Sequence, residues 1–203
     1  MQNRAFTLAE VLITLGIIGV LAAILIPLLI SKIQHRQNIS ALKKAYSILQ
    51  QAENNIYVDY GMNSVFLCST NDSYCLGDIY KQYLKILKYD KYIPNSDPEI
   101  CFGANAVILN STENHYCITT VDGIIFDFDM EFSSNSSHTA LINVDINGIK
   151  KPNLFGKDRY IFRIKENKVV PYYNERWDCK NGKGTSYYNY NCAYVYLNQN
   201  GLK

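Results

Sequence analysis

The chain has 203 residues, of which 48% are hydrophobic and 19% are charged, and its formal net charge is +2. This length suits one globular domain with an additional segment. The nearly balanced charge, without a basic stripe, argues against general nucleic-acid binding, so no nucleic-acid partner is expected. Apolar residues are unevenly distributed, because positions 11–30 are almost wholly apolar whereas the remainder is polar and rich in Asn and Tyr.

A long apolar segment begins close to the N-terminus. Residues 6–30 contain a single charged side chain, Glu10. As a helix, this segment is long enough to cross a hydrocarbon core of about 30 Å. Arg4 and the α-amino group precede the segment and favour a cytoplasmic N-terminus, whereas Lys32 and Arg36 follow it, so charge alone does not fix the orientation.

Two ordinary interpretations compete for this segment. A secretory signal peptide has an apolar core of about 7–15 residues followed by a small-residue cleavage site. The apolar run here is longer, and Ala22 and Ala23 lie inside it rather than after it. A plain membrane anchor would leave Glu10 unexplained, because a carboxylate at the centre of a span costs about 2.5–3.5 kcal/mol and usually marks a function.

The residues around Glu10 are more specific than either interpretation. Arg4 and Ala5 precede the string Phe6-Thr7-Leu8-Ala9-Glu10-Val11-Leu12. This string resembles the prepilin processing motif, in which a short basic leader and a small residue precede Phe-Thr-Leu-x-Glu at the start of an apolar helix. The family more often has Gly where Ala5 stands. Over residues 1–30 the chain therefore resembles type IV pilins and type II secretion pseudopilins.

The resemblance implies a path of maturation and assembly. Prepilin peptidase would cut between Ala5 and Phe6 and would methylate the new amino group of Phe6. In a packed filament, Glu10 of one subunit would neutralise the Phe6 amine of its neighbour. Pro27 would mark local melting of the helix in the filament, with a simple kink as the alternative. The implied partners are prepilin peptidase, other pilin-like subunits, an inner-membrane assembly platform and the membrane.

Beyond Ile30 the pattern becomes amphipathic. Apolar residues recur at spacings of three and four, at Leu42, Ala45, Tyr46, Leu49, Ala52 and Ile56. This spacing predicts that the helix continues with one apolar face and ends near Gly61. A helix hairpin with a break near Ser31 is the alternative. The expected parts of the chain are a leader at 1–5, a transmembrane helix half at 6–30, an amphipathic helix extension at 31–60 and an extracytoplasmic head at 61–203.

All six cysteines follow the apolar segment, at Cys68, Cys75, Cys101, Cys117, Cys179 and Cys192. An even count on one side of a membrane segment indicates an oxidising compartment and a disulfide-stapled head. The alternative is six free thiols in a reduced cytosolic domain, but the spacings match no zinc site. Sequence proximity favours the pairs Cys68–Cys75, Cys101–Cys117 and Cys179–Cys192, and other connectivities stay open.

The head is predicted to be α+β. Apolar positions within 79–87 indicate a short helix, which Pro94 and Pro98 end. Later residues have strand-like patterns, at 106–109, 116–120, 124–128, 140–145, 160–165 and 169–173. Four or so antiparallel strands packed against the long N-terminal helix would give a pilin-like architecture.

The segment 145–158 has oxygen-bearing side chains at alternating positions and a glycine, as calcium loops do. Asp145, Asn147 and Asp158 are therefore candidate calcium ligands, although Lys151 and Gly156 stand where a complete motif would have an acid. A turn-rich connector is the competing interpretation, because Asn-Gly and Pro-Asn are turn formers.

No catalytic motif is present, and His35, His115 and His138 have no neighbouring constellation in the sequence, so they are read as surface or satisfied histidines and no enzyme is expected. By resemblance, the chain is a structural subunit of a type IV pilus or type II secretion pseudopilus. It would cross the bacterial inner membrane once, with an extracytoplasmic head, and then enter a periplasmic or extracellular filament. The alternative is a minor or tip subunit whose head binds a secreted substrate, a surface or DNA.

Overall fold

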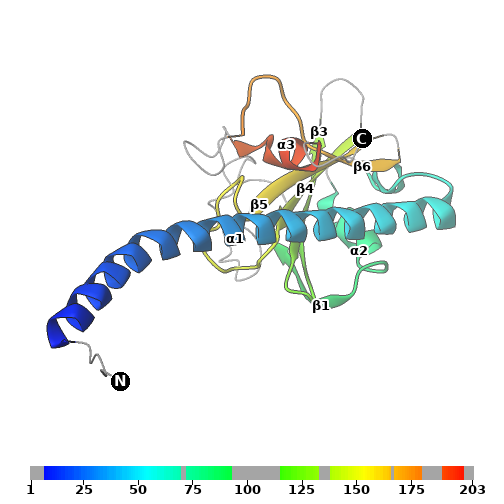
Figure 1. Ribbon diagram of the computed structural model, residues 1–203. Helices are drawn as coiled ribbons and strands as arrows, with labels where there is room; N and C mark the ends of the chain where they lie inside the picture. Colours follow the sequence, from blue (N-terminus) through cyan, green and yellow to red (C-terminus); the bar gives the residue numbers. More distant parts are fainter. Residues whose placement is uncertain are drawn as a thin grey trace. The chain divides into compact units, whose positions relative to one another are not determined.

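The computed structural model describes residues 7–69, 72–92, 115–132, 138–165, 167–179 and 189–198. In chain order its elements are α1 (Leu8–Tyr60), η1 (Ser64–Leu67), α2 (Ser73–Tyr80), β1 (Ile86–Tyr92), β2 (His115–Thr120), β3 (Ile125–Phe132), β4 (His138–Asp145), β5 (Arg159–Lys165), β6 (Lys168–Pro171) and α3 (Cys192–Asn198), as labelled in Figure 1. The division between two compact units falls between Gln37 and Asn38.

The first unit contains the N-terminal segment of α1, residues 8–37. Its large apolar side chains are exposed, from 42% at Val11 to 78% at Leu8. By length and composition, this helix is able to cross a membrane. Pro27 lies inside α1, and the helix continues through Ser31 without a break. The alternative of a hairpin near Ser31 is therefore wrong.

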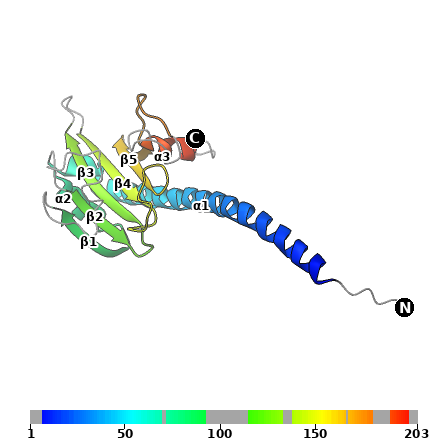
Figure 2. The ribbon, with the colours of Figure 1, turned by 90° about the vertical axis from the view of Figure 1, so that its left-hand side faces the viewer.

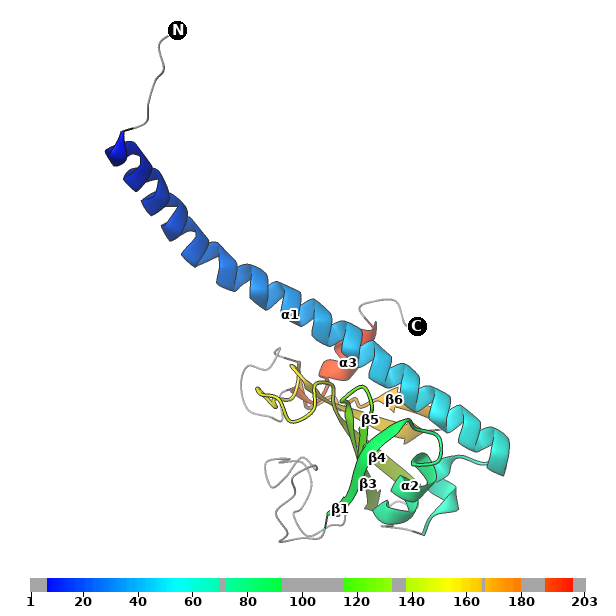
Figure 3. The same cartoon turned by 90° about the horizontal axis from the view of Figure 1, so that it is seen from below.

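The C-terminal segment of α1, residues 38–60, belongs to the second unit and packs with the sheet (Figure 3). The predicted apolar stripe is almost fully buried, at Leu42, Ala45, Leu49, Ala52 and Ile56. This burial follows from the three-and-four spacing, which brings these positions onto one helical face.

One carboxylate lies within this buried stripe. Glu53 has no exposed surface. The Ser64 N–H donates to Glu53 Oε1 at 3.0 Å, and the Tyr80 hydroxyl donates to Glu53 Oε2 at 2.6 Å. Burial, together with the Glu53 charge, raises the pKa of Tyr80 well above its usual value, so the phenol keeps its proton. The carboxylate thereby ties α1 to η1 and α2.

The six described strands form one antiparallel sheet in the sequential order β1 to β6 (Figure 2). Alternate residues enter the core shared with α1, including Ile118 of β2, Phe128 of β3, Ile142 of β4 and Phe162 of β5. Tyr46 of α1 stacks on Phe162 with ring centroids 5.6 Å apart. The predicted α+β, pilin-like arrangement of a long apolar helix and an antiparallel sheet is confirmed.

Five of the predicted strands correspond to β2 to β6, with ends that differ by a few residues. The predicted strand at 106–109 lies outside the described residues. The short helix predicted within 79–87 is wrong in position, because α2 is Ser73–Tyr80 and residues 86 and 87 belong to β1. The helix begins earlier because the Asp72 side chain caps it by accepting from the Cys75 N–H at 2.9 Å. Pairing with β2 then holds β1 extended.

Gly77 lies where α2 packs closely on β2, so a larger residue at this position should destabilise the fold. A Cβ there would overlap the Tyr116 ring, and Tyr116 is fully buried. We expect Gly77→Ala to lower the free energy of unfolding by about 1–3 kcal/mol, although alanine is the better helix former. Urea unfolding of the full chain in detergent, without reductant, measures the change. Asn54→Ala on the exposed side of α1 is the control, with an expected change within about 0.5 kcal/mol. A stabilised Gly77→Ala variant would contradict the packing.

Candidate functional site

The first turn of α1 fixes the position of the Glu10 carboxylate. The Thr7 N–H and the Thr7 hydroxyl both donate to Glu10 Oε2, at 2.9 and 2.8 Å. The Glu10 N–H donates back to Thr7 Oγ1 at 3.3 Å. This reciprocal pair is a capping box, in which two otherwise unpaired N–H groups at a helix start are satisfied. Sequence reasoning missed it, although Thr-x-x-Glu before an apolar run is its signature.

Glu10 retains the capacity to bind a cation while it caps the helix. Both hydrogen bonds from Thr7 end on Oε2, and Oε1 accepts no hydrogen bond from the part of the chain that the structure describes. The side chain is exposed within its own chain. Ala5 and Phe6, the residues of the predicted cut, lie outside the described residues. Pro27 lies further along the same helix.

Disulfides staple the head at two described places. Cys68 and Cys75 are bonded across the η1–α2 connection with a Cα–Cα distance of 5.7 Å. Cys179 is bonded to Cys192 at the start of α3, with a Cα–Cα distance of 4.7 Å. These are two of the pairs that sequence proximity favours. Cys117 is also disulfide-bonded, and Cys101, its predicted partner, lies outside the described residues.

The three candidate calcium ligands lie together in the β4–β5 loop. The Asn147 side-chain amide donates to Asp158 Oδ2 at 3.3 Å, and the Asn147 N–H donates to Asp145 Oδ1 at 3.2 Å. Protein donors nevertheless occupy the carboxylates. Asp158 accepts from the N–H groups of Leu154 and Asn153 at 2.6 and 2.8 Å, and Asp145 accepts from Arg159 Nε at 3.0 Å.

The electrostatics of this loop favour the turn-rich connector over a calcium site. The Arg159 guanidinium already supplies the positive charge beside Asp145. Burial raises the pKa of Asp145 to about 7, with Arg159 opposing the shift. No group of three His, Cys, Asp or Glu side chains suited to a metal occurs among the described residues. Calcium binding stays a prediction.

His115 is not isolated in the fold. Its Nδ1 lies 3.0 Å from Asp127 Oδ1 on the neighbouring strand, and the Asn143 side-chain amide approaches Asp127 Oδ2 at 3.4 Å. All three residues are buried. The group satisfies a buried carboxylate in the manner of a structural network, which agrees with the interpretation of a satisfied histidine.

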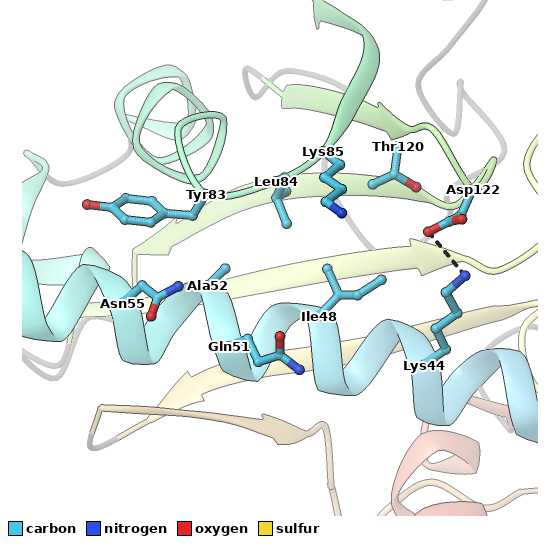
Figure 4. A pocket seen from close by; sticks show the side chains of 10 residues that line it. All are labelled: Lys44, Ile48, Gln51, Ala52, Asn55, Tyr83, Leu84, Lys85, Thr120 and Asp122. Carbon is cyan, nitrogen blue, oxygen red and sulfur yellow. Dashed lines mark ion pairs between the residues drawn. The ribbon is translucent and has the colours of Figure 1, made fainter.

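A groove lies between α1, the segment before β1 and the β2–β3 turn (Figure 4). Its volume is about 280 Å³. Ile48, Ala52 and Leu84 give it an apolar floor, and Lys44 bridges Asp122 at 3.1 Å on its rim. The remaining lining residues are Gln51, Asn55, Tyr83, Lys85 and Thr120. The groove is thus a small recess with an apolar floor and a mostly polar rim.

The comparison with known proteins concerns the N-terminal segment. Residues 1–26 match the family described as the prokaryotic N-terminal methylation motif. The chain carries the signal motif of type IV pilins and pseudopilins. The match includes the Thr7–Glu10 capping box and most of the apolar segment. No curated protein and no solved structure matches the pilin-like chain significantly.

A substitution in the β4–β5 loop of the pilin-like head can distinguish a calcium site from a turn-rich connector. Asp158→Ala would leave two backbone N–H groups without their acceptor, so we expect the free energy of unfolding to fall by about 2–4 kcal/mol in chemical denaturation. Asp122→Ala, which breaks an exposed ion pair, is the matched control and should cost less than about 1 kcal/mol.

Calcium at millimolar concentration should leave the unfolding temperature of the wild-type chain unchanged, because the carboxylates already have partners. A rise of several degrees that Asp158→Ala abolishes would instead establish a calcium site in this loop.

Proposed function

We propose that the chain is a structural subunit of a type IV pilus or a type II secretion pseudopilus. The observation that carries this proposal is a methylation motif at residues 1–26 leading directly into a helix whose apolar side chains are exposed. Exposed apolar surface of this extent needs cover from lipid or from other protein chains. The motif family is structural, which agrees with a chain whose sequence contains no catalytic motif.

The proposed route begins in the bacterial inner membrane. The N-terminal segment of α1 crosses it once, and the disulfides favour an extracytoplasmic head because such bonds persist in oxidising compartments. Prepilin peptidase removes residues 1–5 and methylates the amino group of Phe6. An inner-membrane assembly platform then transfers the subunit into a periplasmic or extracellular filament with other pilin-like subunits.

The Glu10 carboxylate gives this assembly its register. Cleavage creates a positive amine on Phe6, and an unpaired carboxylate in an apolar bundle costs several kcal/mol. Pairing Glu10 of one subunit with the Phe6 amine of the next removes the cost of burying either charge alone. This pairing is possible at only one axial displacement between the two helices. The Thr7 bonds occupy Oε2, so Oε1 can accept the amine of a neighbour while the helix cap is kept. Pro27 marks where the helix loosens during packing.

The groove on the head supports a second candidate function. A minor or tip subunit would use a recessed surface with a polar rim to bind a secreted substrate or another surface. Copy number separates the two candidates, because a structural subunit dominates the mass of purified filaments and a tip subunit is present in traces.

Two substitutions at Glu10 test the proposed assembly. Glu10→Val removes both the charge and the cap, whereas Glu10→Gln keeps an acceptor for the Thr7 N–H and loses only the charge. We expect both variants to assemble at least about tenfold less filament than wild type, because each buries an unpaired amine. Sheared filaments quantified against total membrane-bound subunit provide the measurement.

Thr14→Val is the matched control, since Thr14 is a polar residue of the same segment that bonds only to the Val11 carbonyl within the described residues. It should assemble normally. Normal assembly of Glu10→Gln would contradict the ion pair and would reduce the role of Glu10 to capping.

A further inference from the structure

The β4–β5 loop presents a small apolar and basic surface. Ile149 is 71% exposed and Leu154 is 40% exposed. Lys150 and Lys151 lie between them and are exposed, and neither forms a salt bridge with a described residue. We refer to Ile149, Lys150, Lys151 and Leu154 as the loop tip. It lies in the yellow loop that joins β4 to β5 in Figure 3.

The loop tip is held in place by its own base. The Asn153 side-chain amide donates to the Ile149 carbonyl at 3.3 Å, and the Asp158 carboxylate accepts from two consecutive N–H groups at 153 and 154. The Leu154 carbonyl accepts from the N–H groups of Lys157, Asp158 and Arg159. The loop therefore presents two exposed apolar side chains with two lysines between them on a fixed backbone, the combination that interfacial binding uses.

The base of the loop is tied to α1 just beyond the apolar segment. The Asn38 side-chain amide donates to the Lys157 carbonyl at 2.9 Å, within the second unit. Asn38 follows Ile30, the last residue of the apolar run, by eight residues. At the helical rise these residues span about 12 Å. Lys32 and Arg36 lie between, as expected of a chain passing through lipid headgroups.

We propose that the loop tip docks on the anionic headgroup surface of the membrane that holds α1. Ile149 and Leu154 enter the interfacial layer, and Lys150 and Lys151 contact lipid phosphates. Asn38, which is bonded to the base of the loop, follows Ile30 by only about 12 Å of helix, and a charged membrane surface attracts basic side chains over about 8–10 Å. Apolar side chains flanked by lysines are typical of interfacial binding.

This inference rests on the proposed function, because α1 must be anchored in a bilayer. It adds a state in which the unassembled subunit lies with its head against the membrane. Transfer into a filament then requires the loop tip to leave the lipid, so the docked state holds subunits in reserve at the membrane surface.

The test uses the full chain reconstituted in vesicles that contain brominated lipids, which quench nearby tryptophan. Ile149→Trp reports on the loop tip. Val58→Trp is the matched control, since Val58 is 79% exposed and follows Asn38 by twenty residues of the same helix, about 30 Å. The native Trp177 is present in every sample, and its signal is subtracted with the wild-type chain.

In vesicles that mix phosphatidylglycerol with phosphatidylcholine, we expect Ile149→Trp to be quenched at least about twofold more than Val58→Trp. Adding Lys150→Glu and Lys151→Glu to Ile149→Trp should reduce its quenching to the level of the control. Vesicles of phosphatidylcholine alone should give intermediate quenching, because only the apolar contribution remains.

Flotation of the same samples separates the possible failures. A chain that does not float with vesicles overturns both the anchored subunit and the docked loop. A chain that floats, with Ile149→Trp and Val58→Trp equally quenched, overturns the docked loop alone. Crosslinks from Lys150 to a second copy, together with equal quenching, would overturn it in favour of a contact between subunits.

Discussion

The apolar side chains in the N-terminal segment of α1 are not buried by any described residue, and they must therefore be buried by lipid or by other chains. Burying one Leu or Ile side chain is worth about 1.5–3 kcal/mol, so a run of such residues must enter lipid or a bundle of other chains. Both environments accept the same apolar surface, and neither fixes an axial position. Glu10 is the only formal charge along residues 7–31, and we therefore propose that its carboxylate sets the register.

The C-terminal segment of α1 differs from the N-terminal one because its apolar side chains are buried within the chain itself. Its apolar stripe is covered by the sheet, and its one buried carboxylate, Glu53, is satisfied by Ser64 and Tyr80. Two described disulfides add covalent links beside the short helices α2 and α3, whose apolar side chains already belong to the core. The helix α1 therefore has one apolar segment that is exposed, which we propose serves assembly, and one apolar stripe that is buried in the head.

The parts of the fold that could be predicted from the sequence are those in which apolar residues repeat at helical or strand spacings. The stripe from Leu42 to Ile56 and the strands β2 to β6 repeat at helical and strand spacings, so sequence alone located them. Residues 86 and 87 of the edge strand β1 were predicted as helix because apolar residues within 79–87 recur at helical spacings, which carry no sign of the pairing with β2. Local sequence patterns cannot predict contacts between residues of different elements. Two examples are the backbone N–H groups that donate to Asp158 and the approach of His115 to Asp127 on the next strand. The capping box at Thr7 was readable, but the resemblance drew attention to Glu10 alone.

The intact mass of the chain from its native membrane, with and without prepilin peptidase, tests the central claim most directly. We expect the peptidase to remove residues 1–5 and to add one methyl group to Phe6, and we expect the full-length mass to persist without it. A mass unchanged by the peptidase, or a cut near Ala23 within the apolar run, would contradict the account, because the segment would then be an ordinary anchor or signal peptide.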